Sequence, residues 1–147
     1  MAGLPPSRTR RCTAFLLAIV VCALCGSIAQ TQFNLAELQA LGLPIPAGVR
    51  LQTTWRDIYG FGPLYAAVVA VGLLPAFALA GALARGGRSR LPLYLVAGGS
   101  AVWAALASAN ALAGIPVLVF AARVPAGLAC LVGGGVLAGA VYALRTR

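Results

Sequence analysis

Four long apolar runs restrict what this chain can fold into more than any other feature of its sequence. They cover approximately residues 12–29, 62–83, 91–113 and 125–144, and they contain no Asp, Glu, Lys or Arg. An α-helix rises 1.5 Å per residue, so runs of about 18 to 23 residues match a hydrocarbon core roughly 30 Å thick. The sequence therefore predicts an all-α integral membrane four-helix bundle that forms a single domain over residues 1–147.

The charged residues indicate which partners the chain can have. Of the 147 residues, 61% are hydrophobic and only 9% are charged, whereas a soluble domain has about 25% charged residues. The formal net charge is +9, and all eleven basic residues are arginines. These arginines flank the apolar runs and do not cluster with aromatic residues, which favours a lipid bilayer over nucleic acid as the partner.

The distribution of arginine predicts the orientation. Eight of the eleven lie in the N-terminal tail, in segment 84–90 and in the C-terminal tail, and three lie in the other two connections. By the positive-inside rule, both termini are cytoplasmic and loop 30–61 is external, in the inner (plasma) membrane of a bacterium. Residues 1–29 also resemble a secretory signal that ends in Ser27-Ile28-Ala29. A retained span is the preferred interpretation because the apolar run is long for a signal, and both interpretations stay open.

The external loop 30–61 contains both acidic residues of the chain. Apolar residues recur at helical spacing on each side of a Pro/Gly break, which predicts two short amphipathic helices. The loop can cap the bundle or present a docking surface, and we expect its acids to pair with its arginines at the surface. The candidate external contact residues are Glu37, Arg50, Trp55, Arg56, Asp57 and Tyr59.

Small residues predict how the spans pack, because helices in lipid associate where small side chains let their backbones approach. Gly135 and Gly139 form a GxxxG pair in the last span. Ser100, Ala104 and Ser108 recur at four-residue spacing in the third span, where Asn110 is expected to bond a neighbouring helix. Contacts within one bundle are the preferred interpretation, and a homo-oligomer or another membrane protein is the alternative.

The residues available for chemistry are few. The chain has no histidine, which excludes histidine-based metal sites and catalytic triads. We predict no catalytic residue, metal ligand or cofactor. Cys22 and Cys25 form a CxxC pair on one helix face, and Cys130 lies at a similar depth. An apolar helix disfavours the reactive thiolate, so a structural role is preferred and a membrane thiol oxidoreductase is the alternative.

The order TQFNLAELQALG, a Pro/Gly break, and WRDIYGFGPLY leading into the second span resembles small four-span inner-membrane proteins of proteobacteria. The resemblance covers most of the chain; it implies the four-span topology and carries no known activity. The expected function is that of a non-enzymatic structural or accessory component acting through helix or loop contacts. A small oligomeric permease or channel is the second hypothesis, disfavoured because the spans contain no ionisable carboxylate or base.

Overall fold

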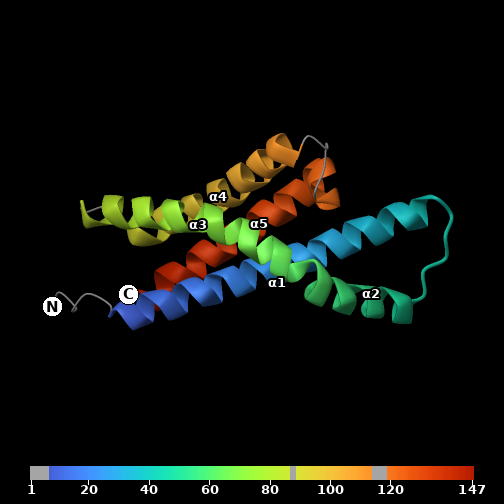
Figure 1. The fold of residues 1–147 in the computed structure, drawn as a ribbon, viewed down its shortest axis with the longest axis horizontal. Helices are drawn as coiled ribbons and strands as arrows, with labels where there is room; N and C mark the ends of the chain where they lie inside the picture. The colour runs from blue at the N-terminus through green and yellow to red at the C-terminus, as the bar shows by residue number, and fades with distance from the viewer. Residues whose placement is uncertain (1–6, 87–88, 114–118) are drawn as a thin grey trace.

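The computed structural model describes residues 7–86, 89–113 and 119–147. Within these ranges the chain is helical and contains no strand (Figure 1). The elements are α1 (Arg8–Ala40), α2 (Ala47–Gly60), α3 (Gly62–Arg85), α4 (Arg90–Ala113), a 3-10 helix η1 (Phe120–Arg123) and α5 (Pro125–Arg145). Helices α1, α3, α4 and α5 are each long and apolar enough to cross a bilayer. The fold is thus the predicted all-α bundle, and the chain is a multi-pass membrane protein.

Helix α1 is longer than the first apolar run. It contains 33 residues and is therefore about 50 Å long. The helix continues past Ala29 to Ala40, so the first of the two expected loop helices is an extension of the first span. Beyond Gly26 the helix meets no glycine or proline until Gly42, which adopts a left-handed φ of 85°. The Gly42 N–H bonds the Gln39 carbonyl, which ends the helix as glycine commonly does.

Helices α4 and α5 approach most closely through glycines. A Cβ atom added to Gly98 of α4 would collide with the Gly135 carbonyl of α5, and one added to Gly135 would collide with Gly98. One turn further along α5, Gly139 lies directly against the Tyr94 backbone. The GxxxG pair therefore serves a contact within the bundle, where only hydrogen side chains let the two backbones come this close.

Helix α1 packs on α5 and α3 through its own small residues. Gly134 of α5 faces Cys22 and Cys25, and the Tyr65 ring of α3 fills the notch that Gly26 leaves. Large apolar side chains cover the outside of the bundle instead, among them Leu16 and Val20 on α1 and Val71 on α3. Small residues inside and large apolar residues outside are the arrangement expected of a bundle whose solvent is lipid.

Both described ends of the chain lie at one end of the bundle (Figure 1). Four aromatic rings pack together there, one from each spanning helix. Phe77 contacts Tyr142 with ring centroids 4.8 Å apart and Tyr94 at 5.5 Å, while Phe15 contacts Phe77 at 6.2 Å. The opposite end carries the α1 extension and α2, which project beyond the other helices as a hairpin.

Candidate functional site

The α1–α2 hairpin, formed by residues 30–60, contains most of the polar side-chain contacts outside the terminal end. The Thr31 hydroxyl donates to Oδ2 of Asp57 at 2.6 Å, and Nε2 of Gln32 donates to the Thr54 hydroxyl at 3.1 Å. Both bonds cross from α1 to α2 and are partly shielded from solvent. A short bond from a hydroxyl to a carboxylate is among the stronger kinds of hydrogen bond.

Arg50 joins the two helices a second time. Its Nη1 donates to Oε1 of Gln32 at 3.0 Å, and its Nη2 donates to Oε1 of Gln39 at 2.7 Å. The expected pairing of acids with arginines is wrong within the described residues, because Asp57 bonds Thr31 and Arg50 bonds two glutamines. Glu37 is exposed and forms no ion pair there. The Arg50 guanidinium bonds two amide oxygens that lie on the same face of α1, about two turns apart, and the sequence pattern does not reveal this arrangement.

The outward face of α2 is apolar. Leu51, Trp55 and Tyr59 follow one another at four-residue spacing and are 72%, 59% and 67% exposed. The Trp55 and Tyr59 rings contact edge to face, with centroids 5.4 Å apart. Helix α2 therefore turns its hydrogen-bonding residues toward α1 and its largest apolar residues outward, while Arg56 is exposed beside them.

A small buried polar group lies where the hairpin joins the bundle. The Ser27 carbonyl oxygen lies 3.0 Å from the same Thr31 hydroxyl oxygen, so it shares the single hydroxyl proton with Asp57. Among the described residues, the buried Ser27 hydroxyl has no hydrogen-bond partner. The buried Tyr65 hydroxyl has no oxygen or nitrogen partner there and lies beside the Cys22 thiol. Nearby, Oε1 of Gln30 accepts from the Ala121 N–H at 2.8 Å and ties α1 to η1. The signal in the sequence that could have indicated this polar cluster is the occurrence of Ser27, Gln30 and Thr31 close together near the end of the first apolar stretch.

The three candidate thiol residues differ in how deeply they are buried. All four cysteines are free. Cys22 is buried and Cys25 half-buried against Gly134, whereas Cys130, one turn earlier on α5, is exposed. In the described part of the chain, no three His, Cys, Asp or Glu side chains gather in a way that could hold a metal ion.

The expected packing stripe on α4 points away from α5. Ser100, Ala104 and Ser108 are exposed and line a groove of about 640 Å³ beside α3. The Ser100 hydroxyl bonds the Val96 carbonyl of its own helix at 2.8 Å. Asn110 is half-buried and borders a small cavity of about 70 Å³. Within this bundle α4 packs on α5 through its glycine face and not through the stripe, and packing of the stripe against a second copy or another membrane protein stays a prediction.

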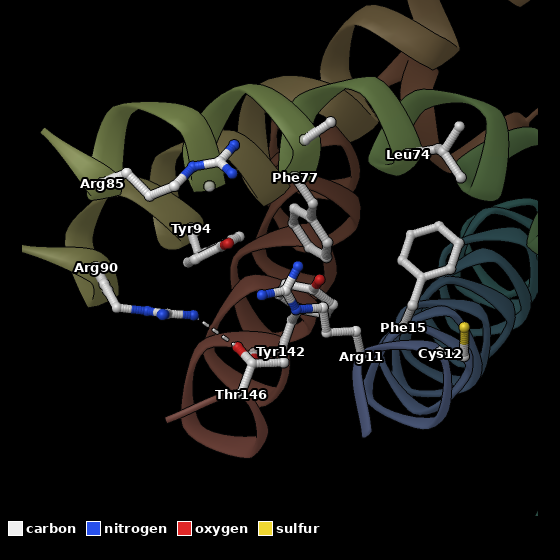
Figure 2. A pocket seen from close by; sticks show the side chains of 12 residues that line it. Arg11, Cys12, Phe15, Leu74, Phe77, Arg85, Arg90, Tyr94, Tyr142 and Thr146 are labelled. Atoms are coloured by element: carbon white, nitrogen blue, oxygen red, sulfur yellow. Dashed lines mark hydrogen bonds between the residues drawn. The ribbon is translucent and has the colours of Figure 1, made fainter. Parts of the chain in front are cut away.

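A site of mixed polarity lies at the end of the bundle that carries the termini. It is a cleft of about 480 Å³, which we call the basic cleft, and all four spanning helices contribute to it. Arg11 of α1, Arg85 of α3 and Arg90 of α4 surround Tyr94 and Tyr142 there (Figure 2). Its volume is within the range of about 300–1,000 Å³ typical of small-molecule sites.

The three arginines of the basic cleft are held differently. Nη2 of Arg90 donates to the Thr146 hydroxyl at 3.0 Å (Figure 2), and its guanidinium carbon lies 5.8 Å from the centroid of the Tyr94 ring. The guanidinium groups of Arg11 and Arg85 form no hydrogen bond or ion pair within the described residues. The sequence placed these arginines on one side of the membrane but gave no sign that they meet at a cavity. Arg88, predicted to lie beside them, is outside the described residues.

Comparisons with models of protein families, with curated proteins and with solved structures find no match to this chain. The class of the protein follows from its own fold and composition: it is an all-α, multi-pass membrane protein with a projecting helical hairpin at one end and a basic cleft at the other.

Proposed function

We propose that this protein is a non-enzymatic structural component of a bacterial inner membrane, with both termini in the cytoplasm and the α1–α2 hairpin outside. The concentration of eight of the eleven arginines in the two tails and in segment 84–90 of the sequence supports this orientation. In this proposal the hairpin is a rigid fixture that holds the outer ends of α1 and α3 in the headgroup layer. The resemblance to four-span proteobacterial proteins agrees with the same membrane and topology.

The observation that carries the proposal is the inverted amphipathicity of α2. In water, a surface helix packs its apolar face inward and exposes its polar face. Helix α2 does the reverse, because Thr54 and Asp57 bond α1 while Trp55 and Tyr59 face outward. Such a helix is stable where its outer surroundings are apolar at least in part.

The short connection from α2 to α3 determines how deep the apolar face of α2 lies in the membrane. Tyr59 lies three positions before Gly62, which is the first residue of the apolar helix α3. The C-terminal half of α2 therefore lies at the membrane boundary, where tryptophan and tyrosine side chains are enriched. At this depth, the stripe of Leu51, Trp55 and Tyr59 is expected to contact interfacial lipid rather than a second protein.

Tryptophan fluorescence tests the proposal directly, since the chain has two tryptophans. The Trp103→Phe variant keeps only Trp55 and is reconstituted in phosphatidylcholine vesicles whose acyl chains carry bromine at a shallow or a deep position. Trp55 is expected to be quenched more by shallow than by deep bromine. The matched Trp55→Phe variant keeps only Trp103, which is exposed in the middle part of α4 and is expected to respond more to deep bromine.

A Trp55 side chain that lies in water would contradict the proposal. If Trp55 is insensitive to both brominated lipids and is quenched fully by aqueous iodide, the apolar face of α2 lies in water. The hairpin would then be a free surface, and its anchoring role in the headgroup layer would be wrong.

A further inference from the structure

The basic cleft has a charge that the chain itself does not neutralise. Arg11, Arg85 and Arg90 converge on it from three different helices. Both acidic residues of the protein, Glu37 of α1 and Asp57 of α2, belong to the hairpin, which lies at the opposite end of the bundle (Figure 1). The cleft therefore has a net positive field with no carboxylate side chain beside it, and such a field attracts an anion.

The hydrogen-bonding groups at the mouth of the cleft suit a phosphate. Arg90 is positioned by Thr146 and Tyr94, while the guanidinium groups of Arg11 and Arg85 keep all of their donors available among the described residues. Guanidinium groups bind phosphate oxygens through two parallel N–H donors, which makes arginine the preferred residue for this anion.

The polarity of the cleft changes along its depth. Its arginines lie at helix ends: Arg85 is the last residue of α3 and Arg90 is the first of α4. Leu74, also in the wall, precedes Arg85 by eleven positions on α3, which corresponds to about 16 Å along the helix. Leu74 is 63% exposed, and Phe15 of α1 lines the same apolar part.

We propose that the basic cleft binds one anionic phospholipid of the adjacent leaflet, with the phosphate between Arg11, Arg85 and Arg90 and an acyl chain along Leu74 and Phe15. A free phosphate would use the arginines and leave the apolar wall unused, whereas a phospholipid uses both. The contact of Phe77 with Tyr94 joins α3 and α4, which carry Arg85 and Arg90, and the contact of Phe15 with Phe77 joins α1, which carries Arg11. The inference concerns a specific site and holds whichever leaflet surrounds this end.

Native mass spectrometry of the full chain in mild detergent tests the inference. The protein is titrated with dioleoylphosphatidylglycerol and, separately, with dioleoylphosphatidylcholine, and the dissociation constant of the first bound lipid is measured for each. The test variant is Arg11→Gln with Arg85→Gln. The matched control is Arg8→Gln with Arg145→Gln, which removes the same charge from the same end at two exposed positions outside the cleft.

The wild type and the control variant are expected to prefer phosphatidylglycerol, and the test variant to lose affinity for it by roughly 10- to 30-fold, as two near-surface arginines imply. Circular dichroism melting of both variants shows that each is folded. Equal losses in the two variants would overturn the inference, because general surface charge would then explain the binding. No preference over phosphatidylcholine would overturn it too, as would displacement of the lipid by millimolar inorganic phosphate, which would identify a free anion as the ligand.

Discussion

At the scale of single residues, glycine positions determine how closely the helices pack. Gly98 and Gly135 meet backbone to backbone, whereas a Cβ atom at Gly133, two positions before Gly135, would have no atom within 4 Å. We expect Gly135→Leu to destabilise the bundle by at least about 1–3 kcal/mol, since added carbon atoms must push α4 and α5 apart. The measurement is the thermal unfolding midpoint in detergent.

Gly133→Ala is the matched control for that substitution. It is expected to raise the midpoint slightly or leave it unchanged, because alanine is favoured over glycine within a helix by roughly 0.5–1 kcal/mol. If the Gly135→Leu variant has the same unfolding midpoint as the wild type, the α4–α5 contact is not made through this glycine.

The buried hydroxyls allow a second prediction at this scale. Tyr65 is only 1% exposed, and within the described part of the chain its hydroxyl has no oxygen or nitrogen partner, only the weakly hydrogen-bonding Cys22 thiol beside it. A buried polar group without a partner costs about 1–3 kcal/mol, so Tyr65→Phe is expected to leave the stability unchanged or to increase it. Thr31→Val removes the bond to Asp57 and is expected to decrease the stability by about 1–2 kcal/mol. A marked loss of stability in Tyr65→Phe would show that the hydroxyl has a partner after all.

At the scale of elements, side-chain hydrogen bonds join the two helices of the hairpin, in which Leu35 of α1 is buried and no residue of α2 is. Arg50 bonds both Gln32 and Gln39 on α1. We expect Arg50→Ala to increase amide hydrogen exchange over residues 32–40, because the α1 extension loses the contacts that keep it paired. Arg56→Ala, at an exposed position of the same helix, is the control and is expected to leave exchange unchanged. Equal exchange in the two variants would contradict the role given to Arg50.

The ends of the elements also show where sequence reasoning stops. The change from apolar to polar residues near Ala29 predicts the end of the first helix, and the structure shows no helix end there. The backbone continues as a helix to Ala40, because the chain offers no helix-ending residue before Gly42. The bounds of α3 and α5, by contrast, were close to those expected, since Pro63 and Pro125 stand in their first turns.

At the scale of the whole molecule, the number of spans follows from the sequence because lipid requires long apolar helices. The faces by which those helices meet do not follow. Helix α4 has small residues on two faces, so four-residue spacing alone could not separate the Gly98 face from the exposed Ser100 face. The convergence of Arg11, Arg85 and Arg90 on one cavity depends on how three helices cross, which no local pattern contains.

In the proposed topology, the chain spans the membrane four times, both termini lie on the cytoplasmic side and the hairpin lies outside. Cysteine labelling in intact bacterial cells tests it most directly, with Cys12 or an introduced Leu43→Cys as the only cysteine. Cys12 is exposed near the start of α1, and Leu43 is exposed at the tip of the hairpin. A membrane-impermeant maleimide is expected to label the Leu43→Cys variant in intact cells and Cys12 only after the membrane is permeabilised. Labelling of Cys12 in intact cells, or protection of the Leu43→Cys variant there, would contradict the account.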